Sequence, residues 1–368
     1  MEGDLIKITR TLLPLSWLYG AVTATRNWLF EVGVLKSKEY PIPVIGVGNI
    51  TVGGTGKTPH VEYLIRLLSQ HYKVAVLSRG YKRKTTGYVL GTPDTRMQDI
   101  GDEPWQVLQK YPEVYVAVDG NRRRGIERLM TDEATRDVQV ILLDDAYQHR
   151  YVKPGLNVLL IDYHRMITDD ALLPAGRLRE SAKGRRRTNL VITTKCPAGM
   201  TPMDQRVVHQ ALGLRPYQSL FFSTFRYGDM EGLFNGKRRP LKTLEDEEHV
   251  LLLTGIASPE QMMMDLRRFT RHITPLSFPD HHFFTPEDAQ RIEDELKKLS
   301  PPRLIITTEK DATRLRQCPS LSEMVKQCLY ALPIEVEIMR NEQEKFNDKI
   351  VGYVREDSRN SNLVKKQN

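Results

Sequence analysis

A glycine-rich segment at residues 51–58 contains the residue types that bind the phosphates of a nucleotide. Its three glycines let backbone N–H groups approach phosphate oxygens closely. Lys57 can reach the terminal phosphates, and the hydroxyl of Thr58 can bind Mg²⁺. We therefore expect ATP and Mg²⁺ to bind here. The expected nucleotide contacts are Thr51, Val52, Gly53, Gly54, Thr55, Gly56, Lys57 and Thr58.

The neighbours of this loop support the prediction. An apolar run at 42–50 is typical of a buried strand, and apolar residues at helical spacing follow between 61 and 68. Thr51 stands where the strict pattern GxxxxGK[ST] has its first glycine, so the match is not complete. A glycine-rich turn that binds no ligand is the alternative. Turn chemistry alone does not explain GxGKT between a strand and a helix.

An acidic pair, Asp144 and Asp145, follows the apolar run at 138–143. A strand that ends in this way can deliver a carboxylate to Mg²⁺ at the carboxyl edge of a parallel sheet. Asp144 is the first candidate for this role. The alternative is an acidic strand end that caps the following helix.

Basic residues follow two further expected strands. Arg79 comes after the run at 74–77, and Arg122 comes after the run at 114–118. Both would lie at the edge of the sheet where α/β folds bind their ligands. We therefore expect them to bind anionic groups, with a solvated basic surface as the alternative.

Histidines suggest a different hypothesis, a hydrolytic metal centre built from His149 or from Asp280 with His281 and His282. The chain has no HExxH motif and no short repeated histidine spacing. The spacing therefore favours ordinary polar histidines over a metal centre.

Short apolar runs separated by longer polar segments predict an α/β fold with a mostly parallel sheet and helices on both faces. A second series begins at 250–253, with a predicted helix at 291–299 and a strand at 304–307, and it predicts a smaller α/β domain. The run at 334–339 could return alongside 220–225. The predicted divisions are an N-terminal helix region at 1–38, a nucleotide-binding domain at 39–217, an extended linker at 218–247, a smaller α/β domain at 248–332, and a return strand with a tail at 333–368.

The composition limits the compartment and the partners. The 368 residues carry a formal net charge of +8 and are 40% hydrophobic, which is typical of a globular protein with anionic partners. Charge alone does not separate nucleic acid from a membrane or a phosphorylated substrate. The three cysteines, Cys196, Cys318 and Cys328, form no CxxC pair, so a reducing cytoplasm fits best. The N-terminus lacks the features of a secretory signal.

The segment at 12–30 is rich in apolar residues, but polar residues interrupt it, so it falls short of a membrane span. We predict instead a helix that lies on a membrane surface. A helix packed on the protein's own core is the alternative. The expected apolar face contains Leu12, Leu15, Tyr19 and Val22, extended by Trp17, Ala21 and Trp28, and the expected charges for anionic headgroups are Lys7, Arg10 and Arg26.

Several motifs occur together and in order along the chain. They are GNITVGGTGKTP (48–59), LSRGYKRK (77–84), GDEP (101–104), DDAYQHR (144–150), LLPAGRLRE (172–180), TGIASP (254–259), FPDHHFF (278–284) and TTEKDATRL (307–315). In this combination the chain resembles the tetraacyldisaccharide 4'-kinase family of lipid A biosynthesis. Such a set is far more specific than the phosphate loop alone.

The resemblance implies a P-loop α/β/α sandwich and a second, smaller α/β/α domain joined to it by an extended β-stranded linker. It implies transfer of the γ-phosphate of ATP to the 4'-hydroxyl of a tetraacylated glucosamine disaccharide 1-phosphate. The expected location is the cytoplasmic face of a bacterial inner membrane, as a peripheral protein.

The resemblance also implies roles for residues whose spacing alone does not reveal them. Asp102 would be the catalytic base and His281 its partner. The Mg²⁺ and phosphate site would include Asp144, Asp145 and Glu180. The expected contacts to substrate or phosphate are Arg79, Tyr81, Arg122, His149 and Arg179.

The chain departs from the usual pattern of the family at a few positions. Ala146 and Lys82 stand where glycine is more common, Tyr147 replaces phenylalanine, and Ser181 replaces proline. If position 146 requires a positive φ, alanine would strain the turn by about 1 kcal/mol.

Two other classes of function remain as alternatives. A P-loop NTPase of another kind, a GTPase or a nucleic-acid-dependent ATPase, is the first. The guanine-reading NKxD pattern is missing, because Cys196 and Pro197 follow Lys195, and nucleic-acid binding rests only on charge. A membrane-associated nucleotide sensor without catalysis is the second.

Overall fold

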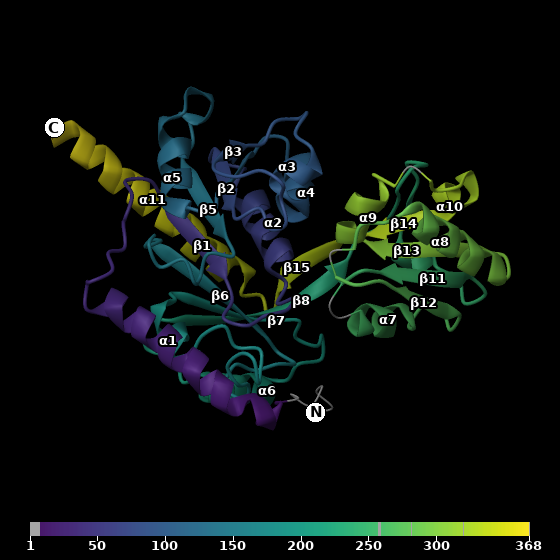
Figure 1. The fold of residues 1–368 in the computed structure, drawn as a ribbon, viewed down its shortest axis with the longest axis horizontal. Helices are drawn as coiled ribbons and strands as arrows, with labels where there is room; N and C mark the ends of the chain where they lie inside the picture. Colours follow the sequence, from purple (N-terminus) through teal and green to yellow (C-terminus); the bar gives the residue numbers. More distant parts are fainter. Residues whose placement is uncertain (1–7, 257–258, 281, 319, 368) are drawn as a thin grey trace. The chain divides into compact units, whose positions relative to one another are not determined.

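The structure is a computed structural model that describes residues 8–256, 259–280, 282–318 and 320–367, with the side chains of the last helix described as far as Asp357. The chain divides into two compact units, which Figure 1 shows as a ribbon. Unit 1 consists of residues 1–225 and 336–368, and unit 2 consists of residues 226–335.

A mostly parallel sheet forms the centre of unit 1. Its strands within the described residues are β1 (Val44–Gly48), β2 (Val74–Ser78), β3 (Val89–Leu90), β4 (Tyr115–Val118), β5 (Val140–Asp144), β6 (Leu156–Asp162), β7 (Leu190–Thr194), β8 (Ser219–Tyr227) and β15 (Ile334–Ile338). They lie in the order β15-β8-β7-β6-β1-β5-β2-β4-β3. Neighbours from β8 to β4 pair in parallel, and β3 pairs antiparallel with β4. The strands predicted at 42–50, 74–77, 114–118 and 138–143 are all confirmed.

Helices cover both faces of this sheet, which confirms the predicted α/β/α arrangement. The helices of unit 1 are η1 (Arg10–Leu12), α1 (Leu13–Glu31), α2 (Lys57–Leu68), α3 (Met97–Ile100), α4 (Asp102–Lys110), α5 (Arg122–Thr131), η2 (Glu133–Thr135), η3 (Ala182–Arg187), α6 (Pro202–Leu212) and α11 (Gln343–Gln367). Side chains of α2, α4 and α11 share a core with one set of alternating strand residues. Those of α5 and α6 pack on the opposite set.

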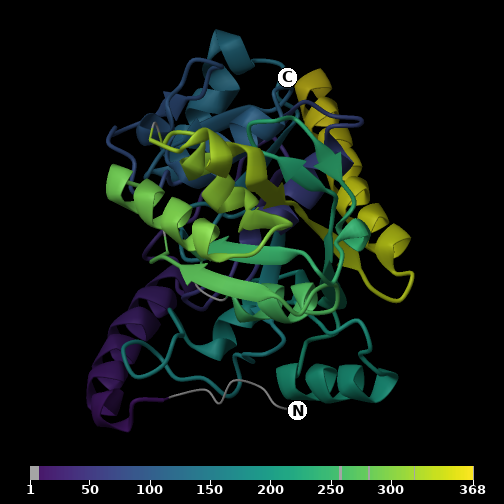
Figure 2. The same ribbon diagram turned by 90° about the vertical axis from the view of Figure 1, so that its right-hand side faces the viewer.

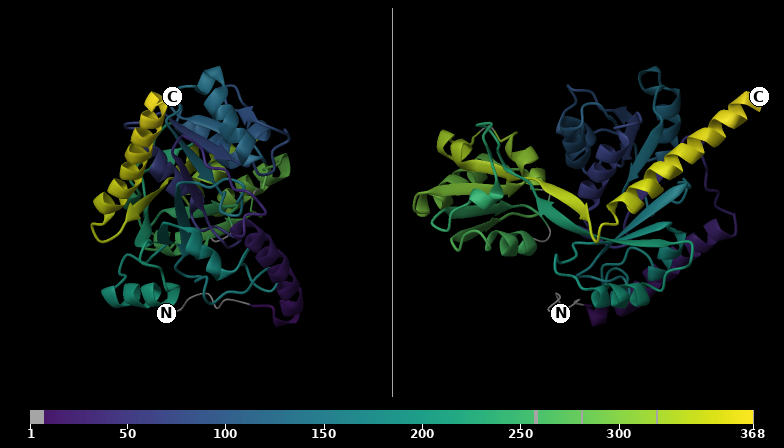
Figure 3. Two further views of the ribbon diagram at one scale, coloured as in Figure 1. Left: turned by 90° about the vertical axis from the view of Figure 1, so that its left-hand side faces the viewer. Right: turned by 180° about the vertical axis from the view of Figure 1, so that it is seen from behind.

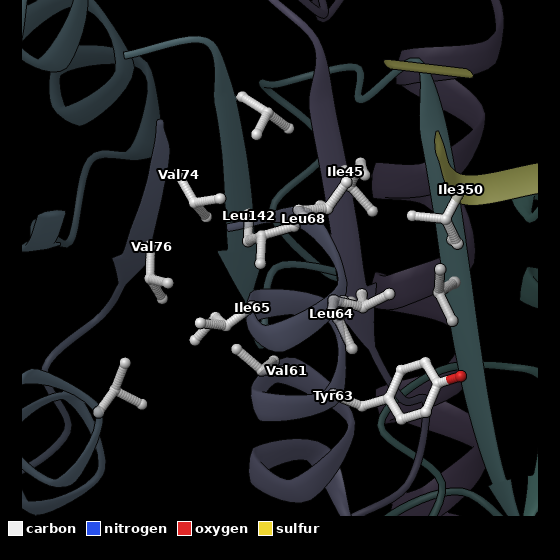
Figure 4. Packing of buried hydrophobic residues seen from close by; sticks show 14 of the residues in the cluster. Ile45, Val61, Tyr63, Leu64, Ile65, Leu68, Val74, Val76, Leu142 and Ile350 are labelled. Carbon is white, nitrogen blue, oxygen red and sulfur yellow. The ribbon is translucent and has the colours of Figure 1, made fainter. Parts of the chain in front are cut away.

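The two faces arise because successive residues of a strand point in opposite directions. Ile45 of β1 lies in the core under α2, whereas Val44 lies in the core with α5. Figure 4 shows the first of these cores, with Leu64 and Leu68 of α2 among side chains of the sheet and Ile350 of α11. The strands are thus buried on both sides, as expected for a parallel sheet.

Unit 2 has its own sheet and its own core, drawn mainly in green in Figure 2. Its described elements are β9 (Met230–Gly232), β10 (Arg238–Arg239), η4 (Leu241–Thr243), β11 (His249–Thr254), α7 (Glu260–Leu266), β12 (Ile273–Ser277), α8 (Pro286–Lys298), β13 (Arg303–Thr308), α9 (Glu309–Leu315), α10 (Glu323–Cys328) and β14 (Leu329–Leu332). The strand order is β10-β9-β14-β13-β11-β12. Helix α8 packs on one face of the sheet and α7 on the other, so the predicted smaller α/β domain is confirmed.

The stretch at 218–247, predicted as an extended β-stranded linker, forms three strands that belong to the two sheets. Strand β8 pairs with β7 in unit 1, whereas β9 and β10 belong to the sheet of unit 2. The reason is burial, because Phe221 and Phe222 of β8 each enter a core of unit 1. The predicted return of 334–339 beside 220–225 is confirmed, since β15 is the neighbour of β8.

Helix α1 confirms the helix predicted at 12–30 and lies along the outside of unit 1, in purple in Figure 3. Trp17 and Leu18 are 72% and 65% exposed, and further exposed apolar side chains are Leu15, Val22 and Trp28. Tyr19 does not share this face, because its hydroxyl donates a hydrogen bond to the carbonyl of Arg179. Among the described helices, none combines the length and the apolar character that crossing a bilayer requires.

Candidate phosphate-binding and catalytic site

The glycine-rich loop connects β1 to α2, as predicted. Strand β1 is fully buried and ends at Gly48, and α2 begins at Lys57. Gly53 and Gly56 have φ values of +112° and +82°, a region that residues with a side chain rarely adopt. The loop therefore ends at the first turn of a helix, where backbone N–H groups favour an anion.

The motif at 172–180 forms the support of this loop. The N–H of Val52 donates to the carbonyl of Arg177 at 2.8 Å, and the N–H of Arg179 donates to the carbonyl of Ile50 at 2.8 Å. The side chain of Asn49 donates to the hydroxyl of Thr55 at 2.8 Å. The loop is thus fixed from outside before any nucleotide binds.

Asp145 brings three predicted residues together. Its carboxylate lies 3.6 Å from Nζ of Lys57 and 3.1 Å from the guanidinium of Arg179. Burial opposes ionisation of Asp145, but the charges of Lys57 and Arg179 outweigh it and lower its pKa. Asp145 is therefore a carboxylate that holds Lys57 at the loop.

Asp144 is in the opposite situation, because burial and neighbouring carboxylates outweigh the nearby positive charges. Oδ1 of Asp144 has no hydrogen-bond partner among the described residues. Burial, then Glu103 and Asp145, raise the pKa of Asp144 to about 7, against the effect of Lys57 and Arg122. A buried carboxylate oxygen beside the phosphate loop fits a divalent cation, which would supply the missing positive charge.

Glu103 was not predicted as part of the site. It follows Asp102 in GDEP, and its charge is the largest Coulombic contribution to the raised pKa of Asp144. Spacing gave no signal for this neighbour, since the two residues lie on different elements, α4 and β5. The structure therefore adds a second acidic residue to the surroundings of Asp144.

Arg122 contacts the backbone of Asp144. It is the first residue of α5, and Asn121 caps this helix by accepting from the N–H groups of Arg123 and Arg124. The guanidinium of Arg122 donates to the carbonyl of Asp119 at 2.5 Å and to that of Asp144 at 3.4 Å. Burial lowers the pKa of Arg122 to about 10, so the side chain stays charged at neutral pH.

The turn after β2 carries Arg79 and Tyr81, which are both exposed. A Cβ at Gly101 would lie 2.9 Å from the carbonyl of Tyr81, so this turn contacts the residue before Asp102. Asp102 is the first residue of α4, and its carboxylate accepts the N–H of Glu103 at 3.1 Å. The structure thus places the backbone of Tyr81 next to the residue that precedes the predicted base.

The other predicted ligands have mixed surroundings. Glu180 pairs with Arg187 at 2.7 Å and accepts from Gln148 at 3.2 Å. Nδ1 of His149 is buried and has no hydrogen-bond partner among the described residues. In the part of the chain that the structure describes, no three His, Cys, Asp or Glu side chains form a group that could hold a metal ion. Asp144, Asp145 and Glu180 are therefore not gathered as one ligand set.

His281, the predicted partner of Asp102, lies outside the described residues. Its neighbour His282, considered above for a metal centre, forms a 2.7 Å hydrogen bond with Asp288 and stacks on Phe278 in unit 2. Within unit 2, His282 is therefore bonded to the first turn of α8.

The strain considered for Ala146 falls on the preceding residue, Asp145, and separately on Lys82, another position where glycine is more common. Ala146 is not among the residues with positive φ, whereas Asp145 has a φ of 47° and Lys82 a φ of 57°. The alanine at 146 is thus compatible with the turn. The conformational cost lies on the acidic residue that pairs with Lys57, as is common at functional sites.

His60 is a further residue at the loop that sequence reasoning missed. Burial lowers the pKa of His60 to about 4, so the ring is neutral at physiological pH. Its Nδ1 lies 2.7 Å from the carbonyl of Gly56, and its Nε2 lies 3.0 Å from the hydroxyl of Ser223. Ser223 is 163 positions away, and no local pattern predicts such a contact.

Comparison with known proteins gives a consistent result. The family model for tetraacyldisaccharide-1-P 4'-kinase matches residues 8–355. The tetraacyldisaccharide 4'-kinase of Phocaeicola vulgatus is 54% identical over 99% of this chain and 100% of its own length. That of Bacteroides thetaiotaomicron is 52% identical over 100% of this chain and 99% of its own. The crystal structure of LpxK from Aquifex aeolicus in complex with ATP is 29% identical, with a TM-score of 0.70, and covers 94% of this chain and 98% of that one.

Proposed function

Since the chain belongs to the tetraacyldisaccharide 4'-kinase family, we propose that the loop at 51–58 in unit 1 carries the activity of that family. The chain is an ATP-dependent kinase that transfers the γ-phosphate of ATP to the 4'-hydroxyl of a tetraacylated glucosamine disaccharide 1-phosphate in lipid A biosynthesis. The observation that carries this conclusion is the loop itself, with Lys57 held by Asp145 beside the buried carboxylate of Asp144.

A turnover assay tests the function. The purified chain is mixed with ATP, Mg²⁺ and the disaccharide 1-phosphate in detergent, and the lipid product is examined for a second phosphate. We expect ADP formation to match lipid phosphorylation one to one. Hydrolysis that depends on GTP or on a polynucleotide instead would favour the other NTPase classes, and ATP binding without turnover would favour a nucleotide sensor.

The loop and its cations would bind and align the triphosphate. Phosphoryl transfer requires mainly alignment and neutralisation of charge on the phosphoryl oxygens. The N–H groups at the start of α2 and the ammonium of Lys57 would meet the β- and γ-phosphates. Arg122, the first residue of α5, and Arg179, in the segment that supports the loop, would add positive charge.

Thr58 and Asp144 are the residues we propose to hold Mg²⁺. When bound, this ion neutralises charge that develops on the phosphates. Magnesium usually takes one or two protein ligands beside water and phosphate oxygens, so a larger acidic cluster is not required. Asp145 would act indirectly, by positioning Lys57. Glu180 would also act indirectly, because it ends the segment at 172–180 that supports the phosphate loop.

Asp102 is the residue we propose as general base. The 4'-hydroxyl oxygen would attack the γ-phosphorus as the bond to the β–γ bridging oxygen breaks and ADP leaves. The hydroxyl proton would pass to the carboxylate of Asp102, with His281 as its partner. Arg79 and Tyr81, on the turn that contacts Gly101, would bind the acceptor sugar or its phosphate.

Asp144→Asn should lower turnover by about 10² and raise the Mg²⁺ concentration needed for half-maximal activity, because the amide keeps the size but loses the charge that attracts the ion. The measurement is a Mg²⁺ titration at saturating ATP. Asp137→Asn is the control, since this carboxylate lies on the surface with Tyr115. A variant with an unchanged Mg²⁺ requirement would assign the metal to other ligands.

The acceptor has four acyl chains, so we propose that the protein works as a peripheral protein on the cytoplasmic face of the inner membrane. The exposed apolar face of α1 supports this proposal, with Trp17, Leu18 and Val22 at 62–72% exposure. Aromatic and aliphatic side chains on such a helix insert into the headgroup region. The inner face of α1 meanwhile fixes the helix to unit 1 through Ser16 and Tyr19.

Replacing Trp17, Leu18 and Val22 together with alanine should weaken binding to anionic vesicles at least tenfold, because the apolar area available for insertion is lost. Sedimentation with vesicles of phosphatidylglycerol and phosphatidylethanolamine measures this, and Met264→Ala, at a similarly exposed methionine of unit 2, is the control. Turnover of a short-chain, soluble acceptor should stay within twofold. Unchanged vesicle binding with a loss of stability would instead indicate that α1 serves only the core.

A further inference from the structure

The last two carbonyls before helix α2, those of Thr55 and Gly56 in the phosphate loop, both accept hydrogen bonds from side chains. The carbonyl of Thr55 accepts from the hydroxyl of Thr194 at 3.0 Å. The carbonyl of Gly56 accepts from Nδ1 of His60 at 2.7 Å and from the N–H of His60 at 3.3 Å. Carbonyl oxygens repel phosphate, whereas the N–H groups of an αL–αR turn attract it. These bonds therefore fix the loop in the orientation that binds an anion.

The other side of the His60 ring faces strand β8. A carbonyl only accepts, so Nδ1 must carry the proton, and in a neutral ring Nε2 then accepts from the hydroxyl of Ser223 at 3.0 Å. Ser223 is fully buried, and its own carbonyl accepts from the N–H of Cys196 at 2.9 Å. One side chain thus connects the loop to β8 through two defined hydrogen bonds.

Phe225 strengthens the same connection by packing. A Cβ at position 56 would lie 2.7 Å from Cζ of Phe225, so the ring fills the space that the missing side chain leaves. The rings of Phe225 and His60 meet edge to face, with centroids 6.3 Å apart. Phe225 is also the last residue of unit 1 before the chain continues into unit 2 at Arg226.

We propose that His60 is a positioning residue that orders the phosphate loop and strand β8 together. The bond to Gly56 keeps the loop in the conformation that binds phosphate. The bond to Ser223 couples this conformation to β8, the strand that leads out of unit 1. This role rests on the proposed function only in requiring that the loop binds ATP.

Three substitutions at position 60 separate the two bonds. The amide nitrogen of asparagine lies near the place of Nδ1, and the end of glutamine lies near the place of Nε2, whereas phenylalanine keeps the volume without either bond. His60→Asn should bind ATP within about twofold of the original chain. His60→Gln and His60→Phe should bind ATP about fivefold to tenfold more weakly, which corresponds to one lost hydrogen bond.

The kinetic test measures KM for ATP and kcat for all three variants and for His71→Phe, a control at an exposed histidine just beyond α2. We expect KM for ATP to rise in the Gln and Phe variants while kcat at saturating ATP changes less than twofold. We expect the Asn variant to restore KM and the control to change nothing. A general loss of stability would lower the amount of active enzyme without this pattern.

The second test measures the connection to β8 directly. In the full-length original chain, Mg²⁺ with the β,γ-imido analogue of ATP should slow amide hydrogen exchange in the peptide 219–225 at least threefold. His60→Asn and Ser223→Ala should bind the analogue normally but lose this protection, because each lacks the bond between the ring and β8. If the Phe variant does not fold, these two variants still carry the test.

Two results would overturn the proposal. One is an ATP affinity in the Gln and Phe variants equal to that of the original chain, and the other is analogue-dependent protection of 219–225 that survives His60→Asn. Neither the binding nor the exchange measurement contains glycolipid. A failed lipid kinase assay with the expected binding and exchange results would therefore contradict the function and leave the role of His60 in place.

Discussion

Lys57→Ala should lower phosphorylation of the glycolipid at least about 10³-fold, the size of effect found when a cation is removed from a phosphoryl-transfer site. Lys57 is the first residue of α2, and its ammonium lies 3.6 Å from Asp145, with the side chain only 16% exposed. Its charge is thus held at the end of the loop, where the terminal phosphates would bind. The small methyl group of alanine can neither neutralise nor align them.

The measurement is single-turnover phosphorylation at saturating ATP and acceptor. Lys153→Ala is a matched control, because that lysine pairs with Glu39 on the surface at 66% exposure. The fold of the Lys57 variant is checked by tryptophan fluorescence, since all three tryptophans of the chain, Trp17, Trp28 and Trp105, lie in unit 1. Turnover near that of the original chain would remove the loop from the mechanism.

Asp102→Ala should lower kcat by about 10² to 10⁴ with little change in ATP affinity, the range expected for loss of a positioned general base. Asp102 is the first residue of α4, half-buried beside the turn that carries Tyr81. The loop proposed to bind ATP is a separate segment, so nucleotide binding should remain. The control is Asp99→Asn, which removes a carboxylate three positions earlier that pairs with Arg96.

His281 is tested by a double-mutant cycle. Residues that act as one unit are not additive, so His281→Ala should reduce kcat, and the double variant should be scarcely worse than Asp102→Ala alone. The pH profile of kcat gives an independent readout, because a base that needs its partner shifts its apparent pKa when the partner is removed. If the two losses multiply, His281 acts independently in substrate binding or in structure.

Together these variants separate the parts of the mechanism. Changes at Lys57 affect the phosphates, changes at Asp144 affect the Mg²⁺ requirement, and changes at Asp102 affect the acceptor hydroxyl. The His60→Gln and His60→Phe substitutions should raise KM for ATP and leave kcat nearly unchanged. The four residues therefore predict four different kinetic signatures from one site.

The sequence by itself determined the parts of this protein that depend on short-range physics. Strands at 74–77 and 138–143 follow from the length of their apolar runs, and α2 follows from helical spacing after the loop. Gly53 and Gly56 mark the turn because positive φ values disfavour other residues. The motif set identified the family, and the family model and relatives confirm it.

Only the tertiary structure decided which side chains meet and how burial changes them. Asp144 and Asp145 are adjacent in the chain, yet burial beside Glu103 raises the pKa of the first, whereas Lys57 and Arg179 lower that of the second. Their different surroundings depend on the strand order, which places β5 next to β1, and on the strained turn at Asp145.

The same reason explains why the partners of β8 and of His60 could not be predicted. Strand β8 joins the sheet of unit 1 because the edge of β7 is available for pairing. The apolar run at 220–225 does not by itself show whether such a partner exists. The contact of His60 with Ser223 spans 163 positions and exists only because the fold brings β8 next to α2. Local patterns determine elements, but long-range packing determines partners, because each element's periodicity records that a face is buried and not what covers it.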